Sequence, residues 1–213
     1  MIYVFDAYGT LFDVHAAVRK HAAALGENAQ RFSEIWRAKQ LEYSWTRSMM
    51  GAHRGFRKLT EESLDYAAAL FGGISPETRA ALLDSYHHLE AYPDVAPAME
   101  RLRAKGARLA ILSNGTPSML ADAATAAGVA PLLDAVLSVE KVRAYKTDPK
   151  VYKLATEHFG ASPGDITFVS GNRWDLAGGI RFGFKGVWLN RGGLPDEYAD
   201  LAPQRVIASL AEL

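Results

Sequence analysis

A carboxylate stands where the first strand-forming stretch of the chain ends. The opening residues read MIYVFDAYGTLFDV, so the apolar run Ile2–Phe5 is followed at once by Asp6, and Thr10 comes shortly after it. An aspartate has an ordinary pKa of about 3.9 and is therefore ionised at pH 7. It can attack an electrophilic carbon or phosphorus atom without the help of a base and form a covalent ester. Nucleophilic hydrolysis is our first hypothesis, and a turn-forming aspartate is its structural alternative.

Other polar side chains follow later apolar stretches in the same way. Ligands of open parallel sheets bind beyond the carboxyl ends of the strands, so we expect these residues to meet Asp6 at one edge of a sheet. A lysine between two carboxylates would offset their repulsion. The residues are Ser113 and Asn114 after RLAIL, Lys146 within RAYKTDP, and Ser170, Asn172 and Asp175 after DITFV.

Short apolar stretches alternate with helical ones, and together they must position these residues. Turn residues bound each strand-forming stretch, and the helical ones begin at Pro or Asp and end at Gly. This alternation predicts an α/β fold, with βαβ units and a parallel sheet that carries helices on both faces. The predicted strands are 2–7, 108–115, 135–140, 165–172 and 186–190, and the predicted helices between them are 93–106, 116–128 and 148–160.

The interval from residue 15 to residue 92 breaks this alternation. Its segments have helical spacing, and none has the pattern of a strand. The interval is too long for one crossover connection. We therefore predict that 15–92 is an inserted helical cap, and that 1–14 and 93–213 form the catalytic core.

Composition limits the classes of function. The 213 residues include 24 Lys plus Arg and 24 Asp plus Glu, so the chain lacks the basic field that nucleic-acid or membrane binding needs. There is no cysteine, which excludes disulfides, thiol nucleophiles and cysteine metal sites. Neither a signal peptide nor a membrane span is visible. The histidines have no metal-binding spacing, and no P-loop or GxSxG motif occurs. We expect a cytoplasmic protein without a metal or cofactor, with a small molecule as its substrate.

Taken in order, these motifs resemble those of the haloacid dehalogenase superfamily, whose fold is a Rossmann-like core around a nucleophilic aspartate. FDAYGTLFDV, ILSNG, YKTDPKVY and VSGNRWD resemble its four motifs. WRAKQLEYSW is similar to the arginine-bearing cap helix of the L-2-haloacid dehalogenases, and GVWLNRGGLPDEY also has a counterpart there. The likeness spans nearly the whole chain. It implies a haloacid dehalogenase-like α/β core with a helical cap, and a homodimer.

The resemblance also implies roles for individual residues. Asp6 would be the nucleophile. Arg37 and Asn114, with the ring of Trp174, would hold the departing halide, and Ser113 would hold the substrate carboxylate together with backbone amides near Thr10 and Leu11. The residues that would orient Asp6 and the hydrolytic water are Lys146, Tyr152, Ser170, Asn172 and Asp175. Gly171 departs from the family pattern, since many members have a second serine there, and this could loosen the water site or alter the rate.

Tyr8 separates the two main reactions of this superfamily. Its phosphatases have a second aspartate at this position, which protonates the leaving alkoxide, and they bind magnesium. A tyrosine with a pKa near 10 is a poorer acid and a poor magnesium ligand. A halide leaves without a proton and needs only positive charge and hydrogen-bond donors, which Arg37 can supply. We therefore predict hydrolysis of short (S)-2-haloalkanoic acids to (R)-2-hydroxy acids through an aspartyl ester.

Three alternatives stay open at this point. They are a magnesium-dependent phosphatase, a C–N hydrolase that acts on a strained ring acid, and a non-catalytic protein that binds small carboxylates. Several residues also have purely structural interpretations: Arg37 could bridge the cap to the core, Asp175 could stabilise a helix N-terminus, and Tyr152 and Trp174 could be packing residues.

Overall fold

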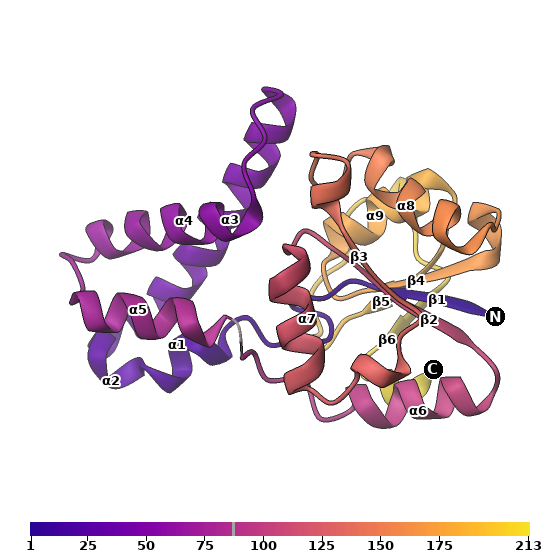
Figure 1. Cartoon of the computed structure of the whole chain (residues 1–213), viewed down its shortest axis with the longest axis horizontal. Helices are drawn as coiled ribbons and strands as arrows, with labels where there is room; N and C mark the ends of the chain where they lie inside the picture. Colours follow the sequence, from indigo (N-terminus) through magenta and orange to yellow (C-terminus); the bar gives the residue numbers. More distant parts are fainter. Residues whose placement is uncertain (87) are drawn as a thin grey trace.

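The computed structural model describes residues 1–86 and 88–213 and contains one parallel sheet. Its six strands lie in the order β3-β2-β1-β4-β5-β6, and every neighbouring pair is parallel. Figure 1 shows this sheet between helices. The predicted fold class is therefore confirmed. The strands are β1 (Ile2–Phe5), β2 (Arg108–Ser113), β3 (Ala135–Ser138), β4 (Ile166–Ser170), β5 (Lys185–Leu189) and β6 (Arg205–Ile207).

The central strand β1 has buried neighbours on both sides. Phe5 is in register with Ile111 of β2 and with Val169 of β4. The ladder to β4 continues past the end of β1, because the Asp6 amide donates to the Val169 carbonyl over 3.0 Å. The carboxyl ends of the three strands consequently lie side by side, and the residues that follow them share one edge of the sheet.

Helices of the core begin and end where their local sequence dictates. Thr116 and Asp148 each accept a backbone N–H at a helix start that has proline in the first turn, and Gly160 ends a helix in the left-handed conformation. Figure 1 shows α8 and α9 above the sheet and α6 below it. These helices are α6 (Val95–Ala104), α7 (Pro117–Ala126), α8 (Pro149–Phe159) and α9 (Arg173–Phe182). The 3₁₀ helices are Gly26–Asn28, Ala130–Leu132, Val139–Lys141, Pro163–Asp165, Ala199–Leu201 and Leu210–Glu212.

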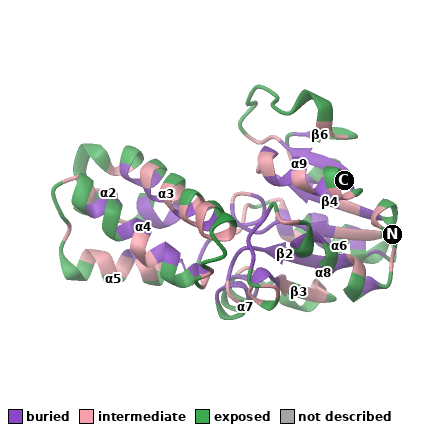
Figure 2. Ribbon diagram, turned by 90° about the horizontal axis from the view of Figure 1, so that it is seen from above, coloured by how far each residue is buried: buried purple, intermediate pink, exposed green. Residues whose placement is uncertain are grey.

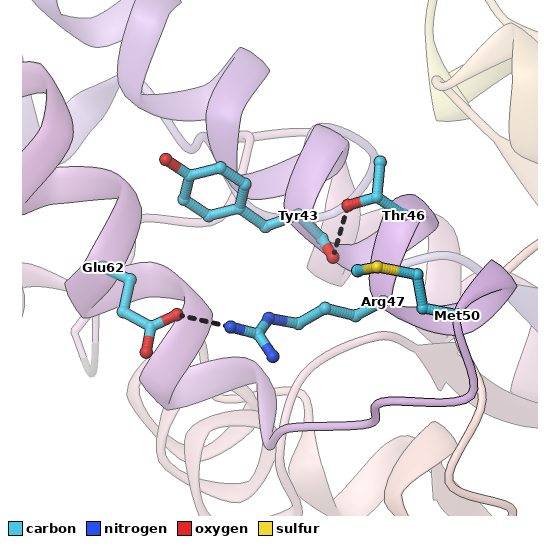
Figure 3. A pocket seen from close by; sticks show the side chains of 5 residues that line it. All are labelled: Tyr43, Thr46, Arg47, Met50 and Glu62. Atoms are coloured by element: carbon cyan, nitrogen blue, oxygen red, sulfur yellow. Dashed lines mark hydrogen bonds and ion pairs between the residues drawn. The ribbon is translucent and has the colours of Figure 1, made fainter.

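Helices alone fill most of the chain between β1 and α6, and they lie to one side of the sheet in Figure 1. The longest two, α3 and α4, pack together, and Arg47 Nη2 of α3 lies 3.4 Å from Glu62 Oε2 of α4 (Figure 3). A surface pocket of about 390 Å³ lies at this contact. The elements are α1 (Ala16–Lys20), α2 (Ala22–Leu25), α3 (Ala29–Met49), α4 (Phe56–Leu70) and α5 (Pro76–Ser85). The division into a cap at 15–92 and a core stays a prediction. His87, within that interval, lies outside the described residues.

Buried residues form a continuous core that joins the two parts. Figure 2 shows buried positions along the strands and on the facing sides of α3 and α4. The aromatic rings of Tyr8 and Phe56 lie at the boundary, with centroids 5.7 Å apart. Among the described residues, no helix is long and apolar enough to cross a membrane.

One strand was not predicted. β6 has only three residues, and its Val206 side chain is 55% exposed at the edge of the sheet. So short an edge strand has neither a buried apolar run nor an alternating pattern, and its pairing with β5 depends on the rest of the fold.

Candidate active site

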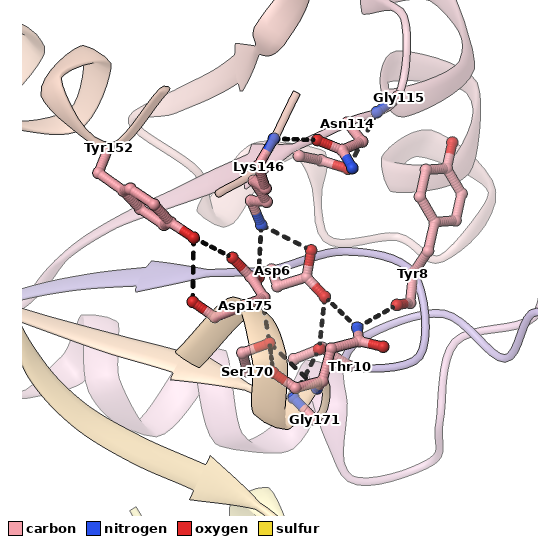
Figure 4. A network of polar contacts seen from close by, with 12 residues as sticks. Asp6, Tyr8, Thr10, Asn114, Gly115, Lys146, Tyr152, Ser170, Gly171 and Asp175 are labelled. Atoms are coloured by element: carbon pink, nitrogen blue, oxygen red, sulfur yellow. Dashed lines mark hydrogen bonds and ion pairs between the residues drawn. The ribbon is translucent and has the colours of Figure 1, made fainter. Parts of the chain in front are cut away.

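Asp6 is buried at the carboxyl end of β1 and accepts hydrogen bonds at both carboxylate oxygens (Figure 4). Oδ1 accepts from Lys146 Nζ over 2.8 Å. Oδ2 accepts from Thr10 Oγ1 and from Asn172 Nδ2, each over 2.8 Å. Donors from three separate loops thus fix the carboxylate in one orientation.

Lys146 bridges two carboxylates. Its ammonium group is 1% exposed and also donates to Asp175 Oδ2 over 2.7 Å. Burial alone would lower the pKa of Lys146, but the charges of Asp175 and Asp6 outweigh it and raise that pKa. The pKa of Asp175 is raised to about 6, because burial and repulsion from Asp6 raise it by more than Lys146 lowers it. The lysine is therefore a firmly held cation, and Asp175 is a carboxyl group that titrates near neutral pH.

The second carboxylate has its own set of donors. Tyr152 donates from its hydroxyl to Asp175 Oδ1 over 2.9 Å, and Ser170 donates to Oδ2 over 3.2 Å. Burial raises the pKa of Tyr152 well above its ordinary value, so its hydroxyl stays protonated as a donor. Asn172, at the start of α9, donates to the Tyr8 carbonyl over 2.8 Å as well as to Asp6.

The backbone at Gly171 approaches the loop after β1 too closely for any side chain. Its N–H donates to Thr10 Oγ1 over 2.8 Å, which leaves the Thr10 hydroxyl proton for Asp6. A Cβ atom at Gly171 would collide with the Gly9 carbonyl oxygen. Glycine at this departure from the family pattern therefore lets two site loops pack directly together, and its effect on the rate stays a prediction.

The loop after β2 lies beside Lys146. Asn114 Oδ1 accepts from the Lys146 backbone N–H over 3.1 Å, and the buried Ser113 hydroxyl accepts from the Gly115 N–H over 3.2 Å. The Thr10 and Leu11 amides both donate to the Ala7 carbonyl within a tight loop. A substrate carboxylate would have to share or replace that acceptor to bind these amides.

Arg37 and Trp174 are not hydrogen-bonded to the network around Asp6 in the described part of the chain. Arg37 Nη1 on α3 donates to Gln40 Oε1 over 2.7 Å. Trp174 packs edge-on against Trp45 of α3, with ring centroids 5.1 Å apart, and lines a cavity of about 950 Å³ that also reaches Lys146. The structure thus places Trp174 at the contact between α3 and the core.

Tyr8 connects Arg37 to the site. It is buried between the rings of Phe56, Tyr86 and Phe12, and in the described structure its hydroxyl has no hydrogen-bond partner. Burial raises the pKa of Tyr8, the charge of Arg37 lowers it and that of Asp6 raises it. The buried Tyr8 hydroxyl is therefore a very weak acid.

Several residues that support the site were not predicted. Arg191 donates to the Thr10 carbonyl over 3.3 Å and to both oxygens of Asp94, which ties the GVWLNRGGLPDEY stretch to the loop after β1. Gln40 follows Arg37 by about one helical turn, and a polar residue on the buried face of α3 was the available signal. The described residues contain no group of three or more metal-binding side chains.

Comparison with known proteins gives one consistent family. The model of haloacid dehalogenase-like hydrolases matches residues 1–183. The chain is 46% identical to (S)-2-haloacid dehalogenase 1 of Pseudomonas sp. (strain CBS-3) over 99% of this chain and 93% of that protein. It is 43% identical to (S)-2-haloacid dehalogenase 4A of Burkholderia cepacia over 99% and 91% of the two chains.

Solved structures agree. The L-2-haloacid dehalogenase of Xanthobacter autotrophicus with chloropropionic acid covalently bound superposes with a TM-score of 0.91 at 33% identity, over 99% of this chain and 95% of that one. A dehalogenase solved with an intermediate complex superposes with a TM-score of 0.97 at 41% identity, over 99% and 94% of the two chains. The resemblance seen in the motifs is confirmed.

Proposed function

The chain belongs to the haloacid dehalogenase-like hydrolases, and we propose that it hydrolyses short (S)-2-haloalkanoic acids to (R)-2-hydroxy acids through an ester on Asp6. It is a hydrolase that acts on carbon–halide bonds. The two relatives compared above, which match nearly the whole chain, are named as (S)-2-haloacid dehalogenases. The observation that carries the mechanism is the set of three donors around Asp6: Lys146, Thr10 and Asn172. They hold both carboxylate oxygens of Asp6 in place at the end of β1.

In the first step an Asp6 oxygen attacks C2 of the substrate from the side opposite the halogen. The new C–O bond forms as the carbon–halogen bond breaks, and the halide leaves with the electron pair, so the configuration at C2 inverts. The leaving group needs no proton. Arg37, with Asn114 and Trp174, supplies the donors and the polarisable surface that receive the halide, because developing negative charge is stabilised by preorganised donors.

The substrate carboxylate binds the Ser113 hydroxyl and the backbone amides at Thr10 and Leu11. The Ser113 oxygen accepts from Gly115, which leaves its own proton for the substrate. The two amides exchange their Ala7 acceptor for the substrate carboxylate. This anchor presents C2 to Asp6.

In the second step water attacks the side-chain carbonyl carbon of the Asp6 ester. Asp175, with a pKa raised by burial to about 6, accepts the proton of that water at neutral pH. The bond between the Asp6 carbonyl carbon and the ester oxygen breaks, and the departing alkoxide takes the proton held by Asp175 and leaves as the 2-hydroxy acid. The second proton of the water is lost to solvent as the Asp6 carboxylate is restored. Lys146 stays between the two carboxylates throughout and offsets the negative charge that develops.

The other candidate functions fit less well. Phosphomonoester hydrolysis needs an acid for the leaving alkoxide, and the residue at that position is Tyr8, whose pKa is raised by burial. Mere binding of a carboxylate needs no attacking carboxylate, lysine and second carboxylate in one buried cluster. The relatives that match the chain over nearly its whole length are named as dehalogenases and not as C–N hydrolases.

Labelled water tests the covalent mechanism. A single turnover of (S)-2-chloropropionate in H₂¹⁸O, with enzyme in excess, should place the label in the peptide that contains Asp6 and leave the hydroxy acid unlabelled. Direct attack of water on C2 predicts the reverse. Label in the product with none in the peptide would refute an Asp6 ester, and no halide release at all would refute the dehalogenase function.

Three further features of the protein belong to this proposal. Residues 15–92 act as a cap that closes over Asp6, the chain forms a homodimer, and it works in the cytoplasm. The cap rests on the helical pattern of this interval, and the homodimer rests on the family resemblance. Light scattering after size-exclusion chromatography tests the dimer, and cell fractionation tests the location.

A further inference from the structure

We propose that Gln40 is a positioning residue for the leaving group, and that it holds the Arg37 guanidinium through a buried relay of side chains that begins at Thr60 on α4. This inference rests on the proposed function, because it concerns the arginine that receives the halide. It assigns a task to a polar side chain that touches none of the reacting atoms.

The relay consists of three consecutive hydrogen bonds. Thr60 Oγ1 donates to the Phe56 carbonyl over 2.9 Å, Gln40 Nε2 donates to Thr60 Oγ1 over 2.7 Å, and Arg37 Nη1 donates to Gln40 Oε1 over 2.7 Å. Gln40 is 0% exposed and Thr60 is 2% exposed. A buried amide of this kind is retained only where its polar atoms have partners.

The direction of the relay follows from the chemistry of its members. A guanidinium can only donate, so the Gln40 oxygen must face Arg37. The Gln40 nitrogen must then face Thr60, whose single proton goes to the Phe56 carbonyl. The Gln40 amide therefore has a single orientation. This also fixes the position of the Arg37 nitrogen from which Gln40 accepts a hydrogen bond.

The far end of the relay is anchored firmly. Trp36 Nε1 donates to the Thr60 carbonyl over 3.0 Å, which ties α3 to α4 next to the relay. The Phe56 N–H, at the start of α4, donates to Glu140 Oε1 over 3.0 Å, and Glu140 lies in the core. The relay thus connects Arg37 through α4 to the 3₁₀ helix Val139–Lys141 that follows β3. Arg37 is therefore held from α4 as well as from α3, the helix on which it lies.

The type of residue at position 40 matters as much as its place. A glutamine accepts a hydrogen bond from Arg37 and carries no charge, so the full positive charge of the guanidinium remains for an anion. A glutamate in the same buried place would form an ion pair with Arg37 and compete with the halide. An arginine side chain loses rotamer entropy when it is held in one place, and a guanidinium bound to Gln40 has lost part of it before the halide arrives.

The experiment compares leaving groups. Wild type, Gln40→Met and Gln40→Glu are assayed in single turnovers with (S)-2-bromopropionate and (S)-2-chloropropionate, and bromide is tested as an inhibitor. Gln30→Met is the matched control, since Gln30 lies exposed on the same helix and bonds only Glu34. Thermal unfolding of each variant shows whether it is folded.

A hydrogen bond to a charged group is strong enough that its loss should slow release of chloride on the order of tenfold. Bromide, the better leaving group, should lose less, so the bromide-to-chloride rate ratio rises in Gln40→Met. Inhibition by bromide should weaken in that variant and more so in Gln40→Glu. Gln30→Met should match wild type. Arg37→Lys should raise the ratio too, and Gln40→Met added to Arg37→Lys should raise it no further.

A folded Gln40→Met protein with the wild-type rate ratio and wild-type bromide inhibition would overturn the inference. If Gln40→Met does not fold, Thr60→Val breaks the other end of the relay, and an unchanged ratio in that variant overturns it equally. Failure of the proposed function has a different signature, because wild type would then release no halide. An unchanged ratio in Arg37→Lys would remove Arg37 from the halide site and the inference with it.

Discussion

Replacement of Lys146 by methionine would leave two buried carboxylates facing each other. The lysine contacts Asp6 Oδ1 over 2.8 Å and Asp175 Oδ2 over 2.7 Å, and it is 1% exposed. At an effective dielectric constant of about 20, each contact has a gross Coulomb energy of about 6 kcal/mol, much of which desolvation offsets. Loss of one partner from a buried ion pair costs about 3–5 kcal/mol net. We expect that loss in the free energy of unfolding of Lys146→Met at pH 8.

The loss should depend on pH in a definite direction. The pKa of Asp175 is already raised to about 6 in the wild type, and loss of Lys146, which lowers it, raises it further above its value in the unfolded chain. The native variant then binds more protons than the unfolded chain at intermediate pH, so its stability falls as the pH rises through that window. Protonation at pH 5 should therefore recover part of the stability. Urea unfolding of wild type and variant at pH 5 and pH 8 measures the difference.

Activity should fall together with stability. A protonated Asp6 cannot attack, and removal of one preorganised donor costs on the order of 10²–10³ in rate. Lys153→Met is the control, because Lys153 is exposed on α8 and pairs only with Glu157. A stability deficit that is equal at both pH values, or halide release within about threefold of wild type, would refute our account of Lys146.

Three more predictions follow from the site. Because the pKa of Asp175 is raised to about 6 and hydrolysis of the Asp6 ester needs its ionised form, the single-turnover rate of ester hydrolysis should fall about tenfold per pH unit below that value. A profile of that rate that stays flat to pH 5 would contradict this. Halide release should survive exhaustive chelation by EDTA, since Lys146 occupies the place between the carboxylates; activity lost and restored by magnesium would favour the phosphatase. Glu140→Ala should lower the free energy of unfolding by about 1–2 kcal/mol, because Glu140 accepts hydrogen bonds from the Phe56 N–H at the start of α4 and from His53. Glu140→Gln should restore part of that free energy. An unchanged urea midpoint in Glu140→Ala would show that the contact is not stabilising.

Sequence patterns predicted the sheet edge well, because polar residues after buried strands have few structural reasons to be there. Asp6, Lys146 and Asp175 meet as the parallel-sheet reasoning required, and the hydrogen bonds among them come from strand order and register. β6 was not predicted. A short edge strand forms because it pairs with the neighbouring strand, and its own sequence carries no strand pattern. Gln40 was not predicted for a similar reason: its partners Arg37 and Thr60 lie on two helices whose pairing no local pattern shows.

The sequence also could not show which of the candidate site residues contact one another. Arg37 shares a helix face with several polar residues, and its orientation depends on packing between α3 and α4. Gly171 was visible as a departure from the family pattern, but the reason for glycine, the approach of the Gly9 carbonyl, appears only when the loops after β1 and β4 are brought together.

Two of the three donors around Asp6 come from very distant parts of the chain. Lys146 is 140 positions away along the sequence and Asn172 is 166 positions away. During synthesis the nucleophile therefore leaves the ribosome long before the groups that orient it. An amino-terminal fragment that stops before β4 lacks Asn172, so it cannot assemble the active site and its Asp6 would be inactive. The chain therefore becomes active only after these late segments have been synthesised and folded. Halide release is thus a sensitive reporter of complete folding for this chain.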